Sequence, residues 1–216
     1  MKEIINNVYM LDGTNSSHVY LIKQNGNNIL IDTGMVGLFK KIESELNSVD
    51  LNIKDINNIL LTHHDIDHIG NAKMLQKASG AKLWISKEDM PYACGKLKRK
   101  GVKRIIQTLI RQEALSDINT YEEGQKFSKA YIIKTPGHTP GHVSVLYENV
   151  LFSGDLFKVK DKSIKLLPRF MNYSEEEIVK SIKALKKLKF EWICPSHGKP
   201  ISAKEKSWTD FVERYQ

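Results

Sequence analysis

The densest group of reactive side chains in this sequence lies directly after a short apolar run. Residues 63–68 read His-His-Asp-Ile-Asp-His, so three imidazoles and two carboxylates fall within six positions. Packed together without a partner, these groups would repel one another or lose their hydration at high cost. A bound cation removes that cost, because divalent metals accept imidazole nitrogens and carboxylate oxygens as ligands. The segment therefore predicts a metal site.

The spacing within this segment divides its side chains between two positions. In an extended chain, side chains two apart point the same way, so His63 and Asp65 can face one cation while His64 faces away from it. Asp67 and His68, at the turn into the next element, can then point at a second position nearby. Two neighbouring metals need more ligands than this segment supplies, so the others must come from elsewhere in the chain.

Three further candidate ligands, His138, Asp155 and His197, each follow a predicted strand later in the chain. Glycine or serine comes directly before each of them, as expected where the backbone must approach a metal closely. Many α/β enzymes keep their chemistry at strand ends, because the sheet fixes the roots of loops that are free to vary. These three residues are therefore predicted to complete the ligand set.

The first half of the chain alternates predicted strands with predicted helices. Apolar runs bounded by turn residues predict strands at 8–11, 19–22, 29–32, 56–61 and 81–85, and helical spacing predicts helices over 38–46 and 70–78. The 56–61 strand delivers the His/Asp segment at its end. From about residue 87 to residue 117 we expect a helical insert that caps the site, with the apolar stripe Val102, Ile105, Ile106, Leu109 and Ile110.

The second half repeats this order of strands and then a helix. Strands are predicted at 131–133, 143–147, 150–152 and 192–194. Ser174 followed by Glu177 is typical of a capping box, so a helix is expected to begin there. Two halves of this kind predict two facing sheets with helices outside. The predicted buried face of the helix is Ile178, Ile182, Leu185 and Leu188.

The composition is that of an ordinary globular chain. With 216 residues, 41% of them hydrophobic and 27% charged, we expect a single domain over residues 1–216 that buries a large core without disulfides. Cys94 and Cys194 lie far apart, and reduced thiols are expected. No apolar run approaches the ~18 residues of a membrane span, and the N-terminus lacks a signal-peptide pattern. We therefore expect a cytoplasmic protein with no membrane partner.

The formal net charge of +8 is concentrated in two basic clusters. A lysine-rich solvated surface is the simpler explanation. The alternative is an electropositive rim that attracts an anionic substrate or nucleic acid. The first cluster is Lys96, Lys98, Arg99, Lys100, Lys103 and Arg104, and the second is Lys158, Lys160, Lys162, Lys165 and Arg169.

Four short motifs occur in order along the chain: residues 63–68 (His-His-Asp-Ile-Asp-His), 137–142 (Gly-His-Thr-Pro-Gly-His), 153–155 (Ser-Gly-Asp) and 195–198 (Pro-Ser-His-Gly). They resemble the signature of the metallo-β-lactamase fold superfamily, which has H-x-H-x-D-H, G-H-T-x-G-H, S-G-D and P-x-H-G stretches. The early strand at 29–34 is also similar. One such motif is weak evidence, whereas four in order over nearly the whole chain are specific.

This resemblance implies an α+β fold, a four-layer αββα sandwich of two mixed β-sheets with helices on the outer faces, and a two-metal centre at one edge of the sheets. The ligands implied by motif position are three for one metal (His63, Asp65 and His138), three for the other (Asp67, His68 and His197) and one bridging carboxylate (Asp155).

Asp65 departs from the family pattern, which has a histidine at this position. A carboxylate is a harder donor and adds negative charge, so it moves the metal preference from zinc alone toward iron or manganese. Flavodiiron-type oxidoreductases are similar in having a carboxylate there. Two Zn²⁺ ions remain the first expectation. The alternative is that Asp65 only orients a ligand and that His64 binds in its place.

Groups that orient the ligands are also predicted from this resemblance. Ligand imidazoles usually donate their second N–H to a nearby acceptor. Asp32 and His142 are predicted to orient ligands or loops in this way, and His64 is predicted either to do the same or to lie at the surface.

The implied activity is that of a glyoxalase II-like metal-dependent hydrolase. A hydroxide bridging the two metals would attack an ester, thioester, lactone or related bond of a small, neutral or anionic substrate, with Asp67 as the catalytic residue that orients the nucleophile and shuttles a proton. A true β-lactamase would carry an export signal, and glyoxalase II enzymes have a longer C-terminal region than the fewer than twenty residues that follow Gly198. Nuclease members usually have an additional domain. Substrate-binding residues are unknown.

Two other classes of function stay open. The first is a di-iron or mono-iron oxidoreductase acting on oxygen or sulfur species, which Asp65 favours. The second is a nucleic-acid-binding protein or nuclease that uses the basic clusters, for which salt-sensitive binding to an oligonucleotide would be the sign. The oligomeric state is also open.

Overall fold

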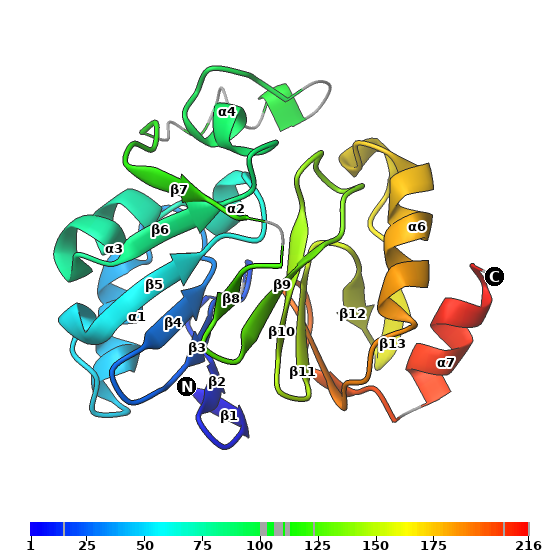
Figure 1. Cartoon of the computed structure of the whole chain (residues 1–216), viewed down its shortest axis with the longest axis horizontal. Helices are drawn as coiled ribbons and strands as arrows, with labels where there is room; N and C mark the ends of the chain where they lie inside the picture. The colour runs from blue at the N-terminus through cyan, green and yellow to red at the C-terminus, as the bar shows by residue number, and fades with distance from the viewer. Residues whose placement is uncertain are drawn as a thin grey trace. The chain divides into compact units, whose positions relative to one another are not determined.

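The computed structural model describes residues 1–14, 16–99, 103–105, 110, 113–122, 124–204 and 206–215. The chain forms two compact units, Met1–Thr120 and Tyr121–Gln216 (Figure 1). Each unit has a sheet and a hydrophobic core of its own. The expectation of a single domain over residues 1–216 stays a prediction.

The first unit is built on a sheet whose described strands follow chain order, β1 to β7. Strands β1 to β4 pair antiparallel, and β4 to β7 pair parallel. The parallel part requires a crossover after each strand, which the helices of this unit supply. The strands are Lys2–Ile5 (β1), Val8–Met10 (β2), Tyr20–Ile22 (β3), Asn28–Ile31 (β4), Ile56–Leu60 (β5), Lys82–Ile85 (β6) and Ile118–Thr120 (β7).

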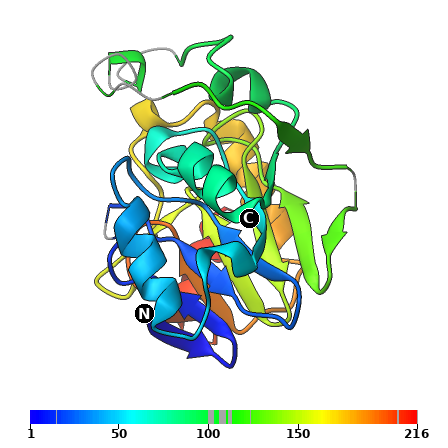
Figure 2. The same ribbon diagram turned by 90° about the vertical axis from the view of Figure 1, so that its left-hand side faces the viewer.

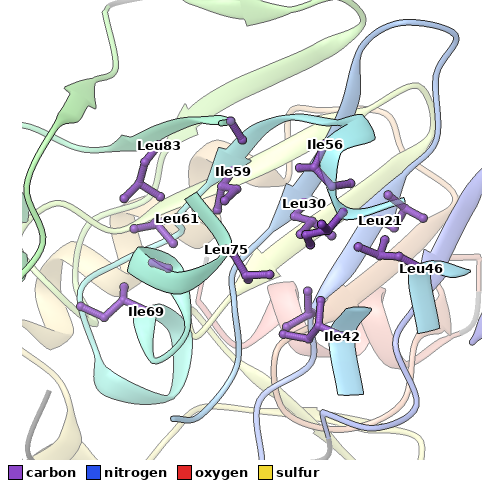
Figure 3. Packing of buried hydrophobic residues seen from close by; sticks show 14 of the residues in the cluster. Leu21, Leu30, Ile42, Leu46, Ile56, Ile59, Leu61, Ile69, Leu75 and Leu83 are labelled. Atoms are coloured by element: carbon purple, nitrogen blue, oxygen red, sulfur yellow. The ribbon is translucent and has the colours of Figure 1, made fainter. Parts of the chain in front are cut away.

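Helices cover one face of this sheet. Figures 1 and 2 show α1 and α3 on the same face of β4, β5 and β6. In Figure 3, Ile42 and Leu46 of α1 and Leu75 of α3 lie toward Leu30 and Ile59 of the sheet, and all five side chains are buried. The helical elements of the unit are α1 (Phe39–Asn47), η1 (Ile53–Asp55), α2 (Ile66–Ile69), α3 (Ala72–Ser79) and α4 (Met90–Ala93).

The predicted helical insert at about 87–117 is helical in only part of its described length. Helix α4 and residues 103–105 are helical, while the described residues 94–99 and 113–117 form turns or have no regular structure. Of the predicted apolar stripe, Ile105 is 60% exposed, and Val102, Ile106 and Leu109 lie outside the described residues. The described part of the insert therefore gives no sign of a long helix with a buried apolar face.

The second unit is built on a sheet with the strand order β15-β14-β11-β10-β9-β8 among its described residues. Strands β11 and β14 pair parallel, and the other neighbours pair antiparallel. A separate hairpin joins β12 to β13. The strands are Lys126–Phe127 (β8), Ala130–Lys134 (β9), Val143–Tyr147 (β10), Val150–Gly154 (β11), Lys158–Lys160 (β12), Ser163–Lys165 (β13), Trp192–Pro195 (β14) and Ile201–Ser202 (β15).

Helices α6 (Glu175–Leu185) and α7 (Lys206–Glu213) lie on the same side of this sheet in Figure 1, and a short 3₁₀ turn, η2 (Arg169–Met171), precedes α6. Ile178 and Ile182 of α6 and Phe211 of α7 belong to one buried cluster with Leu151 of β11. Helix packing on one sheet face therefore forms the core of this unit, as it does in the first.

The start of α6 agrees with the sequence, but its end does not. Ser174 caps the helix by accepting a hydrogen bond of 3.3 Å from the backbone N–H of Glu177. The Glu177 carboxylate lies 2.8 Å from the Lys180 ammonium, and hydrogen bonds to Glu176 and then Glu177 raise the pKa of Lys180 above its usual value. The prediction that Leu188 is buried is wrong: the helix ends at Leu185, and Leu188 is 36% exposed.

The two large mixed sheets with their helices confirm the predicted α+β class. The stacking of the two sheets into four layers stays a prediction. Among the described helices, none has both the length and the apolar character that crossing a lipid bilayer demands.

Candidate metal centre

The His/Asp segment of the first unit lies at the carboxyl end of β5, a strand with parallel neighbours on both sides. After β5 the chain continues through residues 61–65, and Asp65 stands at the N-cap position of α2. His63 and His68 have no exposed surface, and Asp65 is 5% exposed. The Asp67 side chain keeps 23% of its surface exposed. Most of this segment is therefore buried, and the Asp67 carboxylate is partly exposed.

The His68 ring is oriented by Asp32, which directly follows β4. His68 Nδ1 lies 2.8 Å from Asp32 Oδ2, and the Thr62 backbone N–H and hydroxyl donate to the same carboxylate at 2.7 and 2.8 Å. With the carboxylate at Nδ1, Nε2 is the nitrogen that a metal would bind. This contact is the one expected of the orienting role predicted for Asp32, and the metal binding itself stays a prediction. His68 Nε2 lies 3.7 Å from Asp67 Oδ2.

We expect Asp32→Ala to weaken metal binding to the purified chain by about 10- to 100-fold, because His68 loses the group that fixes its ring. Titration with Zn²⁺ against a competing chelator measures this change. Glu43→Ala, a partly exposed carboxylate of α1 that pairs with Lys40, is the control and should keep the parent affinity. An unchanged affinity in Asp32→Ala would contradict the orienting role.

His63 and Asp65 form a second pair of candidate donors. His63 Nε2 lies 3.5 Å from Asp65 Oδ2, and the His63 and His68 ring centres are 3.9 Å apart. Two ligands of one tetrahedral metal are about 3.4 Å apart, since each bond is about 2.1 Å long. The His63/Asp65 and Asp67/His68 pairs both have nearly this separation, so the donors of this unit fit a metal at each pair.

Asp65 also has cationic partners from the segment that follows α4. The Lys103 ammonium contacts Asp65 Oδ2, and Arg99 Nη1 lies 3.8 Å from Asp65 Oδ1. Lys103 and Arg99 are only 8% and 7% exposed, so the prediction that they belong to a solvated surface cluster is wrong for these two. The described members Lys96, Lys98 and Arg104 are exposed, and Lys100 lies outside the described residues.

His64 is a buried residue and not a surface one. Its Nδ1 lies 2.8 Å from Asp89 Oδ2, and its ring stacks on Tyr92 with centres 4.4 Å apart. The Asp89 carboxylate also accepts the backbone N–H of His64 at 3.2 Å. These contacts connect the segment after β5 to α4 and its N-cap residue. Neither Asp89 nor Tyr92 was predicted from the sequence as a partner of His64.

The ligand candidates of the second unit meet at Asp155, directly after β11. Asp155 Oδ2 lies 3.5 Å from His138 Nε2, and Asp155 Oδ1 lies 3.2 Å from His197 Nε2. The carboxylate is 3% exposed. Each of its oxygens therefore faces a different histidine, at the separation expected for two ligands of one metal.

Two further contacts orient these side chains. His138 Nδ1 lies 3.0 Å from Asn172 Oδ1, and the Asn172 amide in turn donates to Glu175 at 2.6 Å. His142 Nδ1 lies 3.0 Å from the Thr135 carbonyl, and His142 Nε2 accepts the backbone N–H of Asp155 at 3.0 Å. His142 thus uses both nitrogens to hold the backbone beside a candidate ligand.

Glycine is required next to two of the candidate ligands. Gly137, before His138, has φ +137°, and a Cβ there would collide with Ile178 of α6. Gly198, after His197, has φ +102°, and a Cβ there would collide with the Val159 carbonyl. The Val159 backbone N–H also donates to the His197 carbonyl at 2.9 Å, so the β12–β13 hairpin packs directly on this turn.

The structure thus gathers four predicted ligands within the first unit (His63, Asp65, Asp67 and His68) and three within the second (His138, Asp155 and His197). That the two sets share the same cations stays a prediction. The orienting partners Thr62, Asp89 and Asn172 were missed, because each contact depends on the folded chain and not on a local motif.

Two mixed sheets with histidines and carboxylates at their strand ends define an α+β metalloprotein fold. A family model described as Metallo-beta-lactamase superfamily matches residues 12–197, and the chain belongs to this superfamily.

Relatives agree with this membership. The protein named "Probable metallo-hydrolase YybB" of Bacillus subtilis is 28% identical over 210 residues, which cover 92% of this chain and 88% of that one. Hydroxyacylglutathione hydrolase GloC of Haemophilus influenzae is 29% identical over 136 residues, 60% of this chain and 61% of that one. These names and the family support a metal-dependent hydrolase.

Solved structures confirm the fold. The metallo-beta-lactamase family protein TTHA1429 from Thermus thermophilus matches with a TM-score of 0.74 at 19% identity, covering 99% of this chain and 81% of that one. At this level of identity the likeness concerns the fold alone.

Proposed function

We propose that the chain is a hydrolase with two metal ions, in which the ligand sets of the two units complete each other. His63, Asp65 and His138 would hold the first metal, Asp67, His68 and His197 the second, and Asp155 would bind both. The observation that carries this proposal is the geometry of Asp155. Each of its two oxygens faces one histidine nitrogen, at the distance expected between two ligands of the same metal. The two donor pairs of the first unit have matching separations.

Two such cations would supply an ionised water at neutral pH and polarise the carbonyl under attack. The protein's own groups would do the positioning. Asp32 holds the His68 ring through Nδ1, and Asn172 holds the His138 ring in the same way. Asp67 is the partly exposed carboxylate of the group, so we assign to it the orientation of the attacking water and the transfer of its proton.

The substrate we propose is a small ester, thioester or lactone. The relative named hydroxyacylglutathione hydrolase supports an acyl-transfer reaction of this kind. Anionic groups on the substrate would meet the exposed Lys160, Lys162 and Lys165 of the β12–β13 hairpin, which packs on the turn that carries His197. Two Zn²⁺ ions are our first assignment, and Asp65 leaves Fe or Mn as the alternative.

A panel of ester, thioester, lactone, lactam and phosphodiester substrates tests this proposal. We expect the Zn²⁺-loaded chain to cleave at least one of the acyl substrates. Asp67→Ala should lower that rate by at least about 100-fold, because it removes both the proton-transfer group and one proposed ligand of the second metal. Glu88→Ala, an exposed carboxylate before α4, is the control and should keep the rate. A metal-loaded chain that cleaves none of these bonds, or an Asp67→Ala variant with full activity, would refute the hydrolase.

A further inference from the structure

We propose that Lys103 competes with the metal for Asp65, so that the metal position at His63 and Asp65 binds its ion much more weakly than the position at Asp67 and His68. This inference rests on the proposed function, because it concerns the same two positions. It makes Lys103 a determinant of how many metals the chain holds, a role that the family's motifs do not include.

The contacts of the Asp65 carboxylate carry the argument. The Lys103 ammonium contacts Oδ2, and this is the same oxygen that lies 3.5 Å from His63 Nε2. The oxygen placed to bind a metal beside His63 is therefore already paired with a cation. The other oxygen, Oδ1, is turned toward Arg99 at 3.8 Å. Both oxygens of this ligand thus lie beside a positively charged side chain.

Burial strengthens this competition. Asp65 is 5% exposed, Lys103 is 8% exposed and Arg99 is 7% exposed, so little water screens their charges. Breaking a buried ion pair is costly, since it leaves a charge without compensation in a medium of low dielectric constant. A metal that binds Asp65 Oδ2 must displace the ammonium and then remain near the guanidinium, which repels it.

The second position has the opposite electrostatics. Two carboxylates act on the same imidazole there: Asp32 at His68 Nδ1, at 2.8 Å, and Asp67 near His68 Nε2, at 3.7 Å. A carboxylate behind a ligand histidine raises the basicity of the ring and strengthens metal binding. The Asp67/His68 position therefore attracts a cation. At the His63/Asp65 position, the charge of the carboxylate is already compensated by Lys103 and Arg99.

The consequence is stepwise loading. At low free metal the chain would hold one ion, at the Asp67/His68 position. The second ion would enter only at a concentration high enough to displace Lys103. The native metal content of the chain would then depend on the metal supply and not only on the number of ligands.

Calorimetric titration of the metal-free full chain with Zn²⁺ tests this inference without using activity. We expect the parent chain to bind two ions in two resolved steps. Lys103→Met, which removes the charge and keeps an unbranched side chain only one heavy atom shorter, should tighten the weaker step by about tenfold or more, or about 1.4 kcal/mol. The tighter step should stay within about threefold of the parent value, and it also reports that the variant is folded.

Two matched variants complete the experiment. Lys98→Met, an exposed lysine of the same cluster, should leave both steps unchanged. Asp65→Asn should remove the weaker step and keep the tighter one. Two binding steps of equal affinity in the parent chain would overturn the proposal that Lys103 competes with the metal. An unchanged affinity of the weaker step in Lys103→Met would also overturn it. A parent chain that binds no Zn²⁺ would instead refute the proposed two-metal function itself.

Discussion

Asp155→Asn is expected to abolish the metal centre and the activity together. The substitution keeps the shape of the side chain but removes its charge and one of the two acceptor oxygens that face His138 and His197. Because both proposed metals depend on this carboxylate, we expect the bound metal to fall below one ion per chain. Hydrolysis should fall by at least about 1,000-fold, which corresponds to about 4 kcal/mol of lost transition-state stabilisation.

Elemental analysis of the dialysed protein measures the metal content, and initial rates on the best substrate of the panel measure the activity. Asp161→Asn is a matched control, because Asp161 lies in the β12–β13 turn with φ +52°, which asparagine also tolerates. The control should keep both metal and rate. An Asp155→Asn variant that retained both ions would show that this carboxylate does not bridge them.

Gly198→Ala is expected to destabilise the chain by about 3 kcal/mol or more, because it combines a strained backbone with overpacking. A Cβ at this position would meet the Val159 carbonyl, and the residue has φ +102°. Neither the turn nor β12 can move away easily, since the Val159 N–H is bonded to the His197 carbonyl. Urea unfolding followed by circular dichroism gives the change in the free energy of unfolding.

Gly124→Ala separates the cost of the strained backbone from the cost of overpacking. Gly124 also has a positive φ, +70°, but a Cβ there would meet no atom within 4 Å. We therefore expect it to cost only about 1 kcal/mol, the strain of the backbone alone. Equal effects of the two substitutions would mean that the contact with Val159 relaxes at no cost.

The sequence located the strand ends at which the candidate ligands lie, because the strands before them are recognisable from their apolar runs. The strand at 56–61 was predicted from its apolar run, and the structure has β5 at Ile56–Leu60. Asp155 was found in the same way after β11. Strand ends are a local feature, so a pattern of a few residues was enough to locate them.

The partners of the ligands could not be found in this way. Asn172 is 34 positions from His138, and Lys103 is 38 positions from Asp65, so no local period connects them. The basic residues between 96 and 104 were treated as one cluster, although folding buries two of them and exposes others. The three-residue strands β12 and β13 were not predicted from the sequence, because alternation over three residues is too short to recognise.

The contacts that orient the histidines also reduce the side-chain entropy that metal binding would lose. The contacts of His68 Nδ1 with Asp32 Oδ2 and of His138 Nδ1 with Asn172 Oδ1 each lie within one unit and join side chains of the protein itself. Immobilising a free side chain costs about 0.5–1.5 kcal/mol. The two imidazoles are already immobilised in the folded chain before a metal binds. Metal binding would therefore lose little further side-chain entropy, and more of the coordination free energy would contribute to the affinity.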